Sequence, residues 1–208
     1  MSDREEKDIR KVRLRILDIV KSFFTGQPDA EKLSRWRGTF SALTKERVNP
    51  VFDQSVRDIH SCLEKRTLVE LQDEYYDLFT DPFTNKQLST TASFYLDGRS
   101  YGQTLVELRG LLAELGIEKK EDVIETEDSL VVMLDVLASL IDETEALDKE
   151  QNQKLQRELL KKYLLPLSEN LKRACGENEA ANFYKACSDF FCGYLELEKG
   201  LTGLDVTH

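Results

Sequence analysis

The sequence has few of the residues and motifs on which enzymatic and metal sites depend. Its only two histidines are His60 and His208, and it has no His-x-x-x-His or Glu-x-x-His pair that could bind a metal. Its ten glycines form neither a Gly-x-x-x-x-Gly-Lys loop nor a Gly-x-Gly-x-x-Gly fingerprint for phosphate groups. No nucleophile stands in a recognisable motif with a base. We therefore expect no catalytic activity, no cofactor and no metal.

Cysteines and long apolar runs are also scarce. The four cysteines, Cys62, Cys175, Cys187 and Cys192, form no Cys-x-x-Cys pair, and their spacing does not indicate a disulfide framework. No apolar run is long enough for a membrane span. The first residues, Met-Ser-Asp-Arg-Glu-Glu-Lys-Asp, are too charged for a signal peptide. The sequence thus predicts a reduced, cytoplasmic protein.

Charge is plentiful and predominantly negative. The chain of 208 residues has a net charge of −10. Acidic surfaces repel the phosphate backbone, so nucleic acid is a poor partner, whereas a cationic peptide or protein is a better one. A chain of this length suits one domain with a sizeable core.

Most of the chain shows the apolar spacing of amphipathic helices. The predicted helices have stripes such as Ile9 to Phe23 and Tyr101 to Leu115. Asn49-Pro50, Thr67 to Glu70, and Asp148 with Gln151 are helix starts. We predict that Pro28 opens a helix, that Pro166 breaks one, and that the last helix runs from about Glu177 to Lys199. The fold class is all-α: one globular bundle of about eight or nine helices over residues 1–208, with frayed ends at about 1–7 and 201–208.

One stretch, residues 87–102, departs from helical periodicity. It contains Phe94, Tyr95, Leu96 and Tyr101, which are too many large apolar groups for a disordered segment. We therefore expect an ordered loop near a binding surface. The residues alone leave equally open a loop whose aromatics simply fill the core.

An acidic segment, residues 118–128, precedes the next helix. Its carboxylates include Glu121, Asp122, Glu125, Glu127 and Asp128. Negative charge before a helix start is favourable to the helix dipole, so capping and solubility explain it simply. The functional interpretation is a site for a cationic peptide beside an apolar groove.

These two stretches, taken in order, resemble the TorD/DmsD/NarJ family of chaperones for molybdenum-containing oxidoreductases. The resemblance runs from about Leu68 to Leu140. It rests on Tyr75 to Phe79, on Ser93 to Gly98 with Tyr101-Gly102, and on Glu125-Thr-Glu-Asp128. Thr126 and Ser129 stand where the family often has proline and histidine, so the role of that histidine does not carry over.

The resemblance implies an all-α, non-catalytic chaperone that occurs as a monomer or a dimer. Such proteins bind the N-terminal segment of an apo-molybdoenzyme, often a twin-arginine signal peptide, or the body of the enzyme. They hold it for molybdopterin insertion before export. The expected partners are thus the catalytic subunit of a molybdenum oxidoreductase and its leader peptide. The alternative is a general helical adaptor that binds another basic amphipathic segment.

The candidate peptide-binding residues combine apolar walls with carboxylates that would face arginines. An apolar groove can accept the apolar run of a leader peptide, and carboxylates pair with guanidinium groups in bidentate fashion. The candidates are Tyr75, Phe79, Phe94, Tyr95, Leu96, Asp97, Tyr101, Glu125, Glu127 and Asp128.

Overall fold

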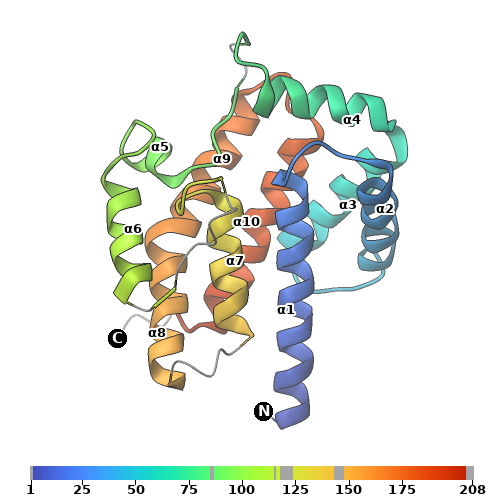
Figure 1. Cartoon of the computed structure of the whole chain (residues 1–208). Helices are drawn as coiled ribbons and strands as arrows, with labels where there is room; N and C mark the ends of the chain where they lie inside the picture. The colour runs from blue at the N-terminus through green and yellow to red at the C-terminus, as the bar shows by residue number, and fades with distance from the viewer. Residues whose placement is uncertain (1, 85–86, 115, 118–123, 143–147, 205–208) are drawn as a thin grey trace. The chain divides into compact units, whose positions relative to one another are not determined.

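The computed structural model describes residues 2–84, 87–114, 116–117, 124–142 and 148–204, and the regular secondary structure within these ranges is helical (Figure 1). The described residues form no strand, only an isolated bridge between Thr91 and Ser129. Some helices join end to end, which leaves nine continuous helical runs in the described part of the chain and confirms the all-α prediction. The segments are α1 (Asp3–Phe24), α2 (Ala30–Leu43), α3 (Pro50–Lys65), α4 (Leu68–Tyr75) with the π-helical η1 (Tyr76–Thr80), α5 (Ala92–Leu96), α6 (Gln103–Glu114), α7 (Leu130–Ile141), α8 (Lys149–Leu159) with the π-helical η2 (Leu160–Leu164) and α9 (Leu165–Glu177), and α10 (Phe183–Leu201).

Most of the predicted helix starts are confirmed by their capping contacts. The side chain of Asn49 accepts from the backbone at the start of α3, and that of Asp148 does the same for α8. Thr67 and Glu70 form a capping box, in which each side chain bonds the backbone of the other. Pro28 does not open α2, because Asp29 caps this helix and Ala30 begins it.

The predicted break at Pro166 was wrong. Helix continues from α8 through η2 into α9, and the π-helical turn ends two residues before the proline. Proline has no N–H to donate and its ring clashes with the carbonyl four residues earlier, so a wider turn accommodates it without ending the helix. Gly176 lies inside α9, and α10 begins at Phe183, six residues later than we predicted.

The first helix, α1, begins at Asp3, within the N-terminal stretch that we expected to be frayed. At the other end α10 continues to Leu201, within the expected tail, and residues 205–208 lie outside the described residues.

The chain divides into two compact units, each built from separate stretches of sequence. Unit 1 comprises residues 1–17, 89–167 and 199–208, and unit 2 comprises residues 18–88 and 168–198. The single-domain assignment stays a prediction. Because α1, α9 and α10 each contribute residues to both units, no cut at one position separates the units in sequence.

Aromatic rings fill the core of unit 2. Phe23 contacts the rings of Trp36, Phe40, Phe183 and Phe190, with ring centroids 5.2 to 6.4 Å apart. The indole Nε1 of the buried Trp36 donates to a side-chain oxygen 2.8 Å away, so its polar atom has a partner.

Unit 1 has an aliphatic core built around α7. Eight of the twelve residues of α7 are buried, and α7 packs against α8. A polar network crosses this core: the buried Gln156 of α8 accepts from Arg13 of α1 at 2.9 Å and donates to the carbonyl of Leu140 at 3.2 Å. α5 packs against α6 in the same unit, and its first residue, Ala92, donates its backbone N–H to the carbonyl of Asp128 (Figure 1).

Candidate functional site

The stretch expected to be one aperiodic loop contains a short helix, α5. Asp128 holds the start of this helix: its carboxylate Oδ2 accepts from the backbone N–H of Ser93 at 2.9 Å, and its carbonyl accepts from that of Ala92 at 2.9 Å. The other carboxylate oxygen accepts from Thr126 Oγ1 at 2.6 Å. The expectation of an ordered segment is confirmed. Asp128, which is distant in sequence, stabilises its first residues.

Asp97 fixes the turn that leads from α5 into α6. Its two carboxylate oxygens accept from the backbone N–H and from the hydroxyl of Thr104, each at 2.8 Å. A Cβ at Gly102 would lie only 2.2 Å from Asp97 Oδ2, so this position has room only for glycine. Asp97 therefore stabilises the conformation of the turn. The sequence analysis missed this role, although Asp97-Gly98 and Gly102 are residues typical of turns.

Large apolar side chains of α5 and of the turn after it are exposed. Tyr101 has a φ of +59° and is 75% exposed, while Phe94 and Leu96 are 44% and 38% exposed. Tyr95 is half-buried and donates its hydroxyl to the carbonyl of Ser89 at 2.9 Å. A non-glycine residue in the left-handed region is uncommon and is found at functional sites more often than elsewhere.

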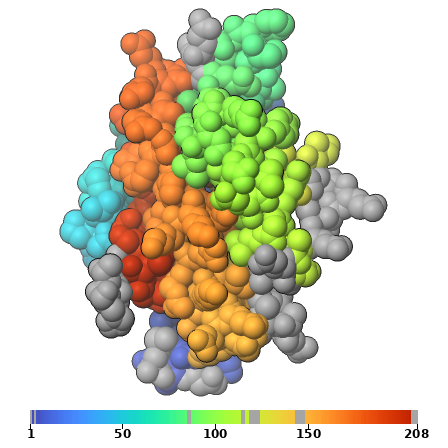
Figure 2. Space-filling model, turned by 90° about the vertical axis from the view of Figure 1, so that its left-hand side faces the viewer, coloured from blue at the N-terminus to red at the C-terminus, as the bar shows by residue number. Residues whose placement is uncertain are grey.

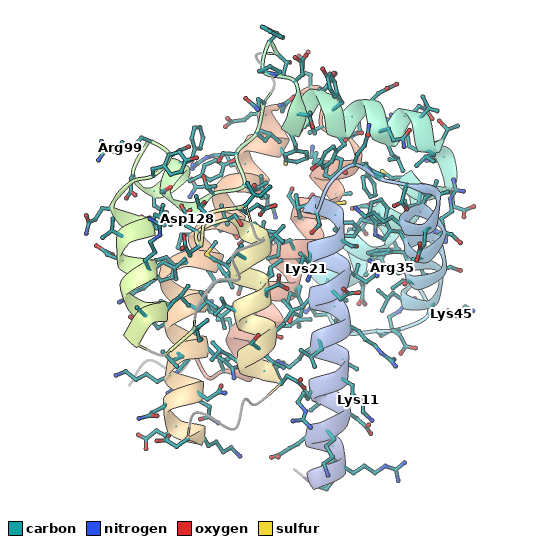
Figure 3. The ribbon with its side chains drawn as sticks, viewed as in Figure 1. Lys11, Lys21, Arg35, Lys45, Arg99 and Asp128 are labelled. Atoms are coloured by element: carbon teal, nitrogen blue, oxygen red, sulfur yellow. The ribbon has the colours of Figure 1, made fainter. Side chains whose placement is uncertain are left out.

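Figure 2 shows α6 and the α5–α6 turn as one continuous exposed face of unit 1, with α8 beside them. Arg99 lies at the outer edge of this turn, and Asp128 lies on its inner side (Figure 3). We call the exposed side chains of Phe94, Leu96 and Tyr101 the apolar patch.

The three described carboxylates of the acidic segment have different environments. Glu127 accepts from Arg109 Nε of α6 at 2.9 Å, and Glu125 accepts from Ser129 Oγ at 2.7 Å. Asp128 is only 1% exposed, which corrects the expectation that it presents a free carboxylate to an arginine. Glu121 and Asp122 lie outside the described residues.

The remaining two candidates, Tyr75 and Phe79, belong to unit 2. Both are half-buried, and their rings lie 5.2 Å from each other and 5.9 Å and 5.0 Å from the ring of Tyr184. Their contacts are those of core residues.

Three of the four cysteines are buried, and Cys62 is half-buried. All four cysteines are free thiols, and burial raises the pKa of Cys175 and of Cys192 to about 12 and that of Cys187 well above its usual value. These thiols stay protonated at neutral pH and are poor nucleophiles. Among the described residues no group of three histidine, cysteine or acidic side chains is placed to hold a metal, and no helix is long and apolar enough to cross a membrane.

Comparison with known proteins identifies the family. The family described as "Nitrate reductase delta subunit" matches residues 46–173, more than half of the chain. The chain belongs to the nitrate reductase delta subunit family. The matched region includes α3 to α8, the apolar patch and the acidic segment.

Two known proteins are similar to this chain over most of its length. The chain is 26% identical over 193 residues to "Chaperone protein TorD" of Aliivibrio salmonicida, covering 86% of this chain and 89% of that protein. It is similar in fold to the crystal structure of a putative redox enzyme maturation protein from Archaeoglobus fulgidus, with a TM-score of 0.51 and 17% identity over 88% of this chain and 93% of the other. Together the family match and the chaperone relative support the assignment of this protein as a redox enzyme maturation chaperone.

Proposed function

We propose that this protein binds the N-terminal segment of an apo-molybdoenzyme catalytic subunit and holds the enzyme until its molybdopterin cofactor is inserted. The single observation that carries the proposal is family membership, because the family works with such subunits. The chaperone names of the family also imply that the protein assists an enzyme without catalysing a reaction itself.

The apolar patch is the proposed contact for the apolar run of the client segment. Exposed groups that a fixed turn holds in place lose little conformational entropy on binding, which favours affinity. Burying apolar surface contributes about 25 cal/mol per Å², so one aromatic ring can contribute a few kcal/mol. Tyr101, with most of its ring exposed, is therefore the residue we expect to matter most.

Glu125 and Glu127 are the proposed partners of client arginines. Exposed ion pairs contribute only up to about 1 kcal/mol each, so these carboxylates would set orientation and association rate more than affinity. Glu127 already bonds Arg109, and a client arginine would share or replace that partner.

The alternative is a general adaptor for any basic amphipathic segment. The family match, which ties the chain to redox enzymes, favours the client-specific chaperone over this alternative. An adaptor would bind an unrelated basic amphipathic peptide as tightly as the client leader.

The direct test is capture of the client in two states. The catalytic subunit of the molybdoenzyme encoded nearest to this chain would be prepared without and with its molybdopterin cofactor. We expect the immobilised chaperone to retain the cofactor-free subunit and not the loaded one. Equal capture of both states, or of neither, would contradict the proposed function.

A further inference from the structure

The first half of α1 has an apolar stripe that the described residues of unit 1 cover only in part. Ile9, Val12 and Ile16 continue the stripe that Val20 and Phe23 form further along the helix. Val20 and Phe23 are fully buried, but Ile9 and Ile16 are only half-buried and Val12 is 54% exposed. No residue from Arg4 to Ile16 is buried.

This part of the helix is basic in an otherwise acidic chain. Between Ile9 and Ile16 it has four cations, Arg10, Lys11, Arg13 and Arg15, and no acidic residue, although the whole chain has a net charge of −10. Lys11 and Arg15 are exposed and lie one turn apart on either side of Val12 in sequence. Lys11 projects from α1 (Figure 3).

Lys11 makes an exposed ion pair within its own helix. Its Nζ lies 3.8 Å from Asp8 Oδ1, and both side chains are well exposed. Such an exposed pair contributes roughly 0 to 1 kcal/mol, so a partner with good geometry can replace it.

We propose that the α1 surface, defined by Lys11, Val12 and Arg15, binds an acidic face of the folded body of the client enzyme. This proposal rests on the proposed function, and it adds a second contact that differs from the leader contact in charge and in sequence position. The two cations of the α1 surface would pair with carboxylates of the client, and the apolar side chain between them would fit an apolar depression there. Complementary charges of this kind favour association between proteins.

An anionic lipid surface fits this part of the helix less well. Interfacial helices insert aromatic or other bulky apolar side chains, and residues 3–16 contain no aromatic residue.

The test compares two ligands and two double variants of the full chain. The ligands are the full-length cofactor-free catalytic subunit and a synthetic peptide of its N-terminal segment. The test variant is Lys11→Glu with Arg15→Glu. The control variant, Lys154→Glu with Lys161→Glu, makes the same change in net charge at exposed positions of α8 and η2 in the same unit.

We expect the test variant to bind the catalytic subunit about tenfold more weakly than wild type and with a smaller dependence on salt. The control variant should bind it like wild type, and both variants should bind the peptide like wild type. Unchanged binding of the subunit by the test variant would overturn the proposal.

Three other results would also overturn it. Loss of self-association with unchanged client binding would assign the α1 surface to an interface between copies of this chain. Loss of binding to vesicles containing anionic phospholipid, with client binding unchanged, would assign it to a membrane. Failure of the wild-type protein to bind either the subunit or the peptide would refute the proposed function together with this inference.

Discussion

At the scale of single residues, the acidic side chain of Glu74 has the most unusual surroundings. It is 6% exposed in unit 2, and its Oε1 accepts from the backbone N–H groups of Asn182 and Tyr184 at 2.8 and 2.9 Å, at the start of α10. Its Oε2 has no hydrogen-bond partner among the described residues. Burial raises the pKa of Glu74, while the bonds from the backbone oppose that rise.

This environment predicts a pH dependence of stability with a definite sign. Because the folded-state pKa is raised, the folded protein holds a proton that the unfolded chain has already released. The contribution of Glu74 is therefore fully present below an unfolded pKa of about 4.5 and is lost as pH rises through the folded pKa. Glu74→Gln should remove this loss from the free energy of unfolding, measured by urea titration between pH 4 and 8.

Glu70 provides the matched control, because its pKa shift has the opposite sign. Bonds from the backbone and hydroxyl of Thr67 lower the pKa of this fully exposed carboxyl. Its contribution is present at neutral pH and is lost as pH falls through the folded pKa. The same pH slope for Glu74→Gln and Glu70→Gln would contradict this account.

Gly102 is the second residue with a specific requirement. Gly102→Ala would push a methyl group into the carboxylate of Asp97 and should lower the free energy of unfolding by about 1–3 kcal/mol. Gly110→Ala is the control, because Gly110 lies inside α6 with no atom within 4 Å of the added Cβ. That change should stabilise the protein by roughly 0.5–1 kcal/mol. Denaturant titration of both variants checks the pair, and equal effects would exclude the proposed clash.

At the scale of elements, contacts between segments distant in sequence determine those helix boundaries that the local sequence does not. The caps at Asn49, Thr67 and Asp148 are predictable because each cap and its helix are neighbours in sequence. The start of α5 was not predicted, because Asp128 caps it from 35 residues away. The continuation of helix past Pro166 was missed for a related reason: the π-helical turn that accommodates the proline follows from packing and not from a residue pattern.

The same distinction applies to the candidate site. An ordered aromatic stretch could be predicted from composition, and the apolar patch is part of it. Which of the acidic residues are buried and which are exposed could not be predicted in this way. Asp128 is buried and holds the start of α5, whereas Glu125 is exposed. Nothing in the sequence marked Thr104 or Arg109 as the partners of Asp97 and Glu127.

Asp128→Ala should therefore act through the conformation of α5. It leaves the backbone N–H of Ser93 and the hydroxyl of Thr126 without their present partner, which should cost about 1–3 kcal/mol of stability. Glu127→Ala removes only the part-exposed ion pair with Arg109 and should change stability by no more than about 1 kcal/mol. Thermal unfolding of both variants distinguishes a structural Asp128 from a purely surface role, in which the two variants would behave alike.

At the scale of the whole molecule, the two units alternate along the sequence, and this arrangement affects how cooperatively the protein unfolds. Since α1, α9 and α10 contribute to both units, we predict one cooperative unfolding transition, in keeping with a single domain. The fluorescence of Trp36, the only tryptophan, reports on unit 2, and circular dichroism reports on all helices. The two denaturant curves should coincide, and separated midpoints would indicate two independent domains.

The central claim is that this chain recognises a client segment through the apolar patch of unit 1. The most direct measurement is calorimetric titration with the N-terminal peptide of the molybdoenzyme catalytic subunit, at low and at high salt. Wild type and the control Phe83→Ala, which alters a 94% exposed ring in unit 2, should bind with the same affinity and weaken modestly with salt. Tyr101→Ala should bind at least about tenfold more weakly, which corresponds to about 1.4 kcal/mol. Equal affinities for Tyr101→Ala and Phe83→Ala, or no saturable binding by wild type, would contradict the claim.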